Sequence, residues 1–98
     1  MAEVRDLYST ADVVFPRGKW TGYEMHVTKT GEVVKVVISP YSKEKGGYYD
    51  VQQKQPGEEG FEQLLRIVFA ALEKYNWKAI QNLENDHPEL YANLKANS

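Results

Sequence analysis

The stretch YYDVQQKQPGEEGFEQLLRIVFAAL, residues 48–72, decides the fold, because its hydrophobic rhythm changes at Pro56 and Gly57. Before this pair, apolar residues alternate with polar ones, as in a strand with one buried face. After it, apolar residues recur at spacings of three and four, as on one side of a helix. The sequence therefore predicts a sheet in the first half of the chain and helices in the second.

The segment 58–75 carries one continuous apolar stripe, which predicts a long helix. The stripe consists of Phe61, Leu64, Leu65, Val68, Phe69, Leu72 and Tyr75. Two short helices are predicted after it. Residues 77–83 present Trp77, Ile80 and Leu83, and a segment that begins at Pro88 presents Leu90, Tyr91 and Leu94. Helices this short are unstable alone, so both need a surface to pack against.

Alternating residues predict a hairpin of two strands, residues 20–29 and 32–39. The side chains expected on its buried face are Tyr23, Met25, Val27, Val34, Val36 and Ile38. A four-residue loop, 28–31, closed by a positive φ at Gly31, would place Met25 opposite Val34 and Tyr23 opposite Val36. Two flanking strands are expected: residues 11–15, with Val13 and Phe15 inward, and residues 47–55, with Tyr49 and Val51 inward.

Together these elements predict one α+β domain over residues 1–98. We expect a flexible N-terminus at 1–9, a sheet within 10–55 and a helical half at 58–96. The sheet is expected to be a four-stranded antiparallel meander, packed on one face by the long helix, in the order β-β-β-β-α-α-α. Whether the two short helices cover the second face of the sheet stays open.

Composition narrows the possible functions. The chain has 98 residues, no cysteine and a formal net charge of −2. Without cysteine there are no disulfides, thiolate metal sites or cysteine nucleophiles, which fits a cytoplasmic location. No cleaved signal and no membrane-spanning run are expected. Residues 16–54 carry a net charge of +3 and residues 58–98 a net charge of −3, so the strand half is mildly basic.

The residues that could carry chemistry are few. His26 and Glu24 share one strand face and could hold a metal ion only with a third ligand, which the sequence does not supply. His87, beside Pro88 at a helix start, is more typical of a turn or cap. No serine has a nucleophile motif around it, and no phosphate-binding glycine motif is present. We therefore expect no catalytic residues, no metal, no cofactor and no enzymatic activity.

What remains is the second face of the sheet, where aromatic rings and cations are expected to mix. The candidate binding residues are Arg17, Lys19, Trp20, His26, Val33, Lys35, Val37, Tyr41, Tyr48 and Lys54. Rings with a charged rim are typical of protein interfaces, which favours an interaction or regulatory module that binds another protein or a second copy of itself. Rings interleaved with lysines also suit single-stranded DNA or RNA, the alternative prediction.

Overall fold

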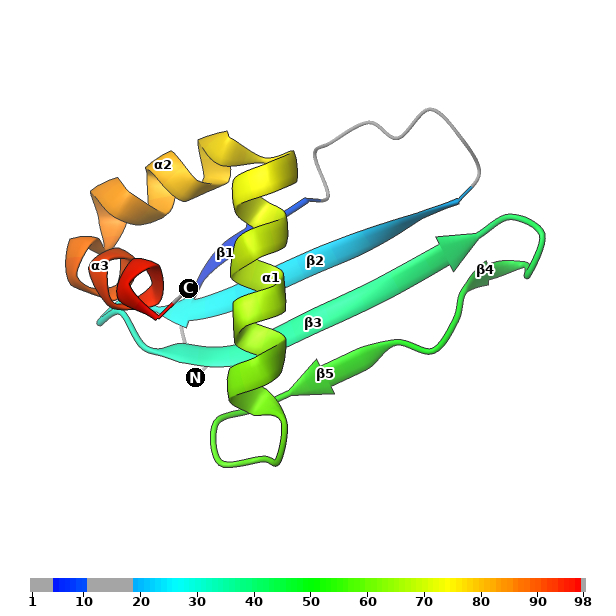
Figure 1. The fold of residues 1–98 in the computed structure, drawn as a ribbon, viewed down its shortest axis with the longest axis horizontal. Helices are drawn as coiled ribbons and strands as arrows, with labels where there is room; N and C mark the ends of the chain where they lie inside the picture. Colours follow the sequence, from blue (N-terminus) through cyan, green and yellow to red (C-terminus); the bar gives the residue numbers. More distant parts are fainter. Residues whose placement is uncertain (1–4, 11–18, 98) are drawn as a thin grey trace.

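The computed structural model describes residues 5–10 and 19–97, which form an antiparallel sheet followed by three helices. The strands are β1 (Arg5–Ser9), β2 (Lys19–Thr28), β3 (Val33–Ser42), β4 (Gly47–Tyr48) and β5 (Gln52–Lys54). The helices are α1 (Phe61–Tyr75), α2 (Trp77–Asp86) and α3 (Pro88–Ala96). Figure 1 shows α1 crossing the sheet, with α2 and α3 gathered at one end of it. The predicted α+β class and the order of strands before helices are confirmed.

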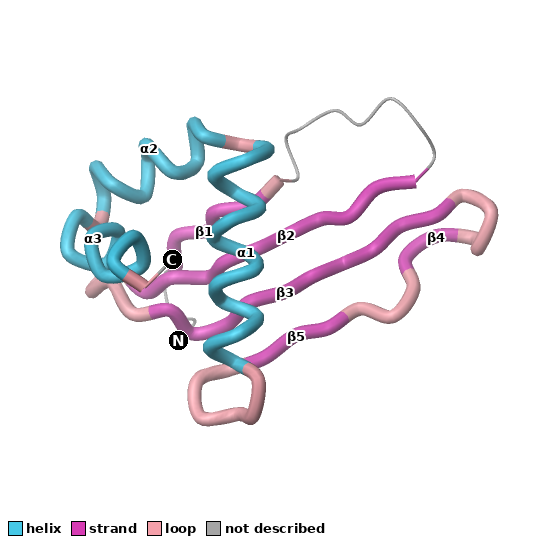
Figure 2. The backbone as a smooth tube through the Cα atoms, viewed as in Figure 1, coloured by secondary structure: helices cyan, strands magenta, loops and turns pink. Residues whose placement is uncertain are grey.

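The sheet is built around the long pair β2 and β3 (Figure 2). β1 pairs with the free side of β2, while β4 and β5 both pair with the other side of β3. The single strand predicted over residues 47–55 is thus split into two short pieces. A break at Tyr49–Val51 separates them, where Asp50 has a φ of 48°.

The first strand lies earlier in the chain than predicted. Residues 5–9 form β1, whereas 1–9 were expected to be flexible, and the strand predicted at 11–15 lies outside the described residues. Burial of Tyr8 holds β1 against the rest of the fold, because this side chain is only 4% exposed and belongs to the core. The sequence hides this strand because its other inward residue, Asp6, is charged.

The predicted faces of the central hairpin are largely right, but the register is wrong by two residues. Met25 lies opposite Val36, and Tyr23 lies opposite Ile38. The loop contains three residues, 29–31, instead of four, since the Thr28 N–H donates to the Glu32 carbonyl at 2.8 Å. This shifts the register by one residue, and an irregularity between His26 and Val27 shifts it by one more. A shift of two residues keeps each side chain on its face, because the side-chain period of a strand is two.

Two β-bulges change faces that simple alternation predicts. His26 pairs with Lys35 but Val27 pairs with Val33, so Val34 is an extra residue on β3. On the other side of β3, Tyr41 pairs with Tyr48 and Val37 pairs with Gln53. The chain advances five residues from Tyr48 to Gln53 but only four from Tyr41 to Val37, so the segment between β4 and β5 contains one extra residue. Each extra residue reverses the alternation beyond it. Val33 and Lys54 consequently lie on the helix side of the sheet.

All three helices pack on one face of the sheet and share a single core. Its most buried members are Met25, Val27, Val36, Val68, Phe69, Leu72 and Leu83. Leu90, Tyr91 and Leu94 of α3 pack against the same cluster. The short helices therefore cover the face that α1 covers, and no described helix lies on the other face, which we call the outer face.

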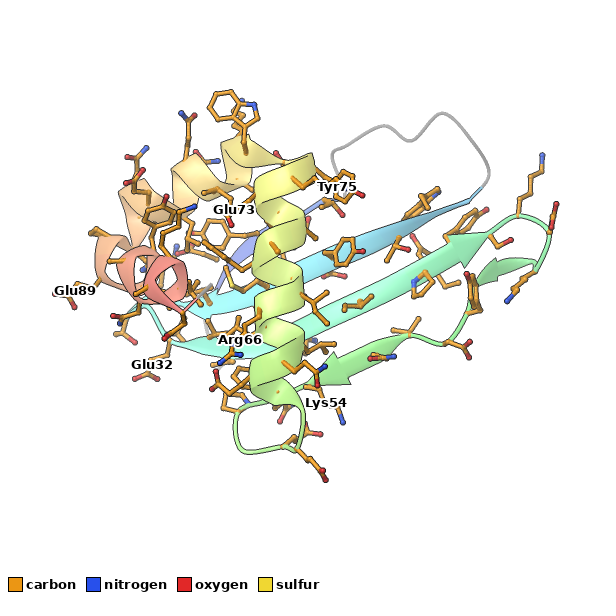
Figure 3. All side chains as sticks on the ribbon, in the orientation of Figure 1. Glu32, Lys54, Arg66, Glu73, Tyr75 and Glu89 are labelled. Atoms are coloured by element: carbon orange, nitrogen blue, oxygen red, sulfur yellow. The ribbon has the colours of Figure 1, made fainter. Side chains whose placement is uncertain are left out.

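The helices differ from prediction mainly at their ends. α1 starts at Phe61 instead of 58, because Glu58 belongs to a turn in which its Oε1 accepts the Gln55 N–H at 2.8 Å. Tyr75, labelled in Figure 3, was expected in the buried stripe but is 44% exposed. Its ring stacks on Tyr23, with centroids 6.5 Å apart. Trp77, expected to face inward on α2, is 64% exposed.

Candidate functional site

Three aromatic rings cluster on the outer face, at the end of the β2–β3 pair that lies away from α2 and α3. Trp20 on β2 pairs with Tyr41 on β3, which pairs in turn with Tyr48 on β4. The Trp20 and Tyr41 rings are stacked, with centroids 4.9 Å apart and planes 12° from parallel. Tyr48 meets Trp20 edge-on at 5.5 Å and Tyr41 at 5.2 Å. We call these three side chains the ring cluster.

The ring cluster is separate from the hydrophobic core. None of its members belongs to the buried cluster beneath the helices, and Tyr48 is 60% exposed. The Trp20 ring also lies along the strand toward Gly22, since a Cβ built on Gly22 would be 3.4 Å from it. The absence of a side chain at Gly22 leaves room for the indole at this place.

Charged and polar groups occupy the centre of the outer face. His26 Nε2 donates to Glu24 Oε1 at 3.2 Å, which joins two neighbours on β2. Lys35 lies opposite His26 on β3, and Leu7 lies opposite His26 on β1. The Leu7 side chain is 54% exposed. An apolar residue thus lies beyond the charges, at the edge opposite the ring cluster.

A lysine-bearing turn joins β3 to β4 next to the ring cluster. The Lys45 ammonium lies 4.0 Å from the centroid of the Tyr49 ring. At this distance the face of the ring attracts the cation. Lys43 and Glu44 in the same turn are exposed. The ring cluster therefore has charged neighbours of both signs.

The structure brings together six of the ten predicted binding residues on the outer face: Trp20, His26, Lys35, Val37, Tyr41 and Tyr48. Val37 shares the face but is only 6% exposed, so its expected exposure is wrong. It occupies the middle of the sheet between Glu24 and Gln53, and longer side chains on both sides shield its short one.

Two of the other four predicted residues, Val33 and Lys54, do not join this surface. Val33 packs against the core, and Lys54 lies on the helix side, near the start of α1 (Figure 3). The bulges at Val34 and Asp50 are the cause. Arg17 lies outside the described residues, and Lys19 is described only as part of the β2 backbone.

A polar network on the helix side was not predicted. Asp6 on β1 accepts from His87 Nε2 at 2.8 Å and from the Lys29 ammonium. The Tyr8 hydroxyl donates to Asp86 Oδ2 at 2.8 Å. These bonds join β1 to the junction of α2 and α3. The alternation of Asp6 and Tyr8 on one strand face was the only sequence signal for them.

The network shifts the pKa values of two of its members. Hydrogen bonds from Lys29 and then His87 hold the pKa of Asp6 below its ordinary value. Burial, and next the hydrogen bond to Asp86, raise the pKa of Tyr8 above its ordinary value. Asp6 therefore stays ionised and Tyr8 stays a hydroxyl donor at neutral pH, which fits a structural role for both.

Neither a metal centre nor a membrane span is found within residues 5–10 and 19–97. No three acidic or histidine side chains there come close enough to hold a metal ion. No helix in these ranges has the length and apolar character to cross a bilayer.

Comparison with known proteins finds no matching family model, no curated protein similar in sequence and no solved structure similar in fold.

Proposed function

We propose that this protein is a non-enzymatic interaction or regulatory module that contacts another protein, or a second copy of itself, through the ring cluster. The observation that carries this proposal is the exposure of Tyr48, at 60%, within a group of three rings outside the core. Tyrosine and tryptophan supply a large share of the binding free energy at protein interfaces. A cytoplasmic location fits the lack of cysteine in the sequence.

Ring geometry favours a protein partner over a nucleic acid. Single-stranded nucleic acids bind by stacking bases on exposed ring faces. Here Trp20 and Tyr41 stack on each other, so each ring already uses one face. The outer face also carries Glu24 beside Lys35 and His26, which weakens any positive field that phosphates would need.

Single-stranded DNA or RNA is the second candidate. The observation that favours it is the turn with Lys43 and Lys45, which adjoins Tyr48. The Lys45 ammonium itself lies over the neighbouring Tyr49 ring. Lysines that contact phosphates beside rings that stack bases are typical of single-stranded nucleic-acid binding. This candidate predicts an affinity that falls steeply as salt rises.

Matched aromatic substitutions test the proposal. Tyr48→Ala removes an exposed ring from the cluster, and Trp77→Ala removes an equally exposed ring from α2. We expect sedimentation to show self-association, or affinity capture to return a stoichiometric partner, that Tyr48→Ala weakens at least tenfold. Trp77→Ala should leave it unchanged. Equal effects of the two variants, or no effect of Tyr48→Ala, would contradict the proposal.

The nucleic-acid candidate has its own readout. Because the chain has two tryptophans, Trp77→Phe leaves Trp20 as the only indole fluorophore. Titration of this variant with single-stranded oligonucleotides at low salt should leave the Trp20 fluorescence unchanged if the partner is a protein. Quenching that disappears with added salt and with Tyr48→Ala would replace the protein proposal with the nucleic-acid one.

A further inference from the structure

The outer edge of β1 presents backbone hydrogen-bonding groups away from the sheet. The Thr10 N–H donates to the Tyr23 carbonyl at 3.0 Å, which extends the β1–β2 register and shows that even-numbered residues face β2. Antiparallel pairing makes alternate residues face opposite ways. The Ser9 carbonyl confirms this, because it accepts from Asn76 Nδ2, on the far side from β2. Leu7 therefore directs its N–H and C=O outward.

Helix α2 runs alongside this edge and leaves a cleft between them. Figures 1 and 2 show α2 on the helix side of the sheet, displaced outward past β1. The cleft has a volume of about 580 Å³, and Leu7, Ser9, Lys78, Asn82 and Asp86 are among its lining residues. A groove between a sheet edge and a helix suits an added peptide strand, with main-chain bonds to the edge and side-chain contacts to the helix.

The cleft contains polar groups that the fold does not use. Within the described part of the chain, neither the Lys78 ammonium nor the Asn82 amide makes a hydrogen bond or ion pair. Asp86 already accepts the Tyr8 hydroxyl, and Asp6 is held by Lys29 and His87. Asp86 keeps its negative charge, because the Tyr8 hydroxyl is neutral, but it lies eight residues along α2 from Lys78, toward the Asp6 end of the cleft. The Lys78 end of the cleft therefore presents a cation that is complementary to a carboxylate.

A second copy of the chain does not fit this edge. Pairing β1 with β1 of another copy would bring two α2 helices to the same side of the joined sheet. Each α2 extends outward past its own β1, so the two helices would occupy the same space (Figure 1). A ligand without a helix at that place, such as an extended peptide, avoids this collision.

We propose that the cleft binds an extended peptide segment with one acidic residue, which adds to β1 as an antiparallel strand. The Leu7 N–H and C=O make the central pair of main-chain bonds. The peptide residue opposite Leu7 is aliphatic and covers that side chain, which is 54% exposed on the outer face. The residue before it is acidic and points to the helix side, toward Lys78. This site is independent of the ring cluster.

The direction of the peptide follows from how β1 and α2 are tied together. Ser9 is joined to Asn76 at the start of α2, and Asp6 is joined to His87 just beyond its end. Lys78, two residues after Asn76, therefore lies toward the Ser9 end of β1. A strand antiparallel to β1 passes Ser9 first, so its acidic residue precedes its aliphatic one.

Binding of blocked hexapeptides tests the proposal. The probe is Thr-Thr-Glu-Leu-Thr-Thr, and its charge-reversed control is Thr-Thr-Lys-Leu-Thr-Thr. In NMR titrations of the full chain, the probe should shift the Leu7 and Lys78 amides and slow hydrogen exchange at the Leu7 N–H. The control should bind about tenfold more weakly, a difference typical of one favourable charge contact. Absence of binding by the probe would overturn the proposal.

Two variants in the cleft and one control variant separate this site from others. Leu7→Pro removes the outward N–H without touching the bonds to β2, a substitution that edge strands tolerate, and should abolish binding of the probe. Lys78→Glu should reverse the preference between the two hexapeptides, which keeps the test decisive if the proline variant fails to fold. Tyr48→Ala should leave peptide binding unchanged. Shifts confined to the ring cluster would overturn this inference and leave the proposed function intact.

Discussion

His87 Nε2 donates a hydrogen bond to Asp6 Oδ2 at 2.8 Å, joining two residues that lie 81 positions apart in the chain. The imidazole is 8% exposed, and its ring meets the Tyr8 ring edge-on, with centroids 6.4 Å apart. The same carboxylate accepts from Lys29 in the β2–β3 turn. Three separate segments of the chain therefore meet at Asp6. The stability of the fold should depend on the negative charge of this carboxylate.

Acid should destabilise the fold partly through Asp6. Its pKa is lowered in the folded state by Lys29 and His87, so below about pH 4 the unfolded chain takes up this proton before the folded chain does. The stabilisation is complete above that pH and is lost as the pH falls through the folded pKa. Urea unfolding of Asp6→Asn should show a lower midpoint at pH 7 and a smaller further loss between pH 4 and pH 3 than the parent chain.

The matched control for this pH effect is Glu59→Gln, at an exposed position before α1. It should leave the dependence of the unfolding midpoint on pH unchanged. An Asp6→Asn variant that lost as much stability in acid as the parent chain would show that other carboxylates account for the effect.

Gly31 and Gly46 should lose similar stability on substitution by alanine. Both have positive φ, +89° and +86°, so alanine at either should cost about 1–2 kcal/mol. A Cβ on Gly31 would lie 3.4 Å from His87 Nδ1, an ordinary van der Waals distance, and nothing lies within 4 Å at Gly46. Denaturant unfolding should therefore show comparable losses for the two variants. A much larger loss for Gly31→Ala would mean that the imidazole cannot accommodate the methyl group.

Val37→Glu should unfold the protein or lower its stability by about 2–4 kcal/mol, because it would bury a charge at a position that is 6% exposed. The sequence alone predicts a different result, loss of a protein interface without unfolding. Circular dichroism melting distinguishes the two results. A stable Val37→Glu monomer would show that its neighbours open easily.

The apolar side of α1 should dominate its contribution to stability. Leu72 is fully buried, so Leu72→Ala should cost about 2–5 kcal/mol. Ile67 on the same helix is 43% exposed, and Ile67→Ala should cost less than about 1 kcal/mol. The free energies of unfolding come from urea titrations. Similar losses for the two variants would contradict the packing of α1 on the sheet.

Hydrophobic periodicity predicted correctly those helices and strands in which the spacing of apolar residues is uninterrupted. The stripe from Phe61 to Leu72 and the buried faces around Met25 and Val36 follow directly from spacing. The bulges at Val34 and Asp50 could not be read in this way, because an extra residue leaves composition and local polarity unchanged. The positions beyond them, Val33 and Lys54, were consequently assigned to the wrong face.

The candidate site was predictable in its rings but not in its partners. Trp20, Tyr41 and Tyr48 share a face because they pair across strands. Alternation placed Trp20 and Tyr48 there, whereas Tyr41 was expected only at the margin, beyond the strand predicted at 32–39, because β3 runs on to Ser42. The exposure of Val37 depends on the lengths of its cross-strand neighbours, which a correct register is needed to identify. The bonds of Asp6 to His87 and of Tyr8 to Asp86 join opposite ends of the sequence, which no local pattern reports.

The tie between β1 and the α2–α3 junction should also govern how fast the chain folds. A contact between residues 81 positions apart can form only after a very long loop has closed, and topologies rich in such contacts fold slowly. The β2–β3 hairpin and α1 can assemble from nearer segments. We therefore expect the early nucleus to contain those elements, with the N-terminal strand and the last two helices docking together in a late step.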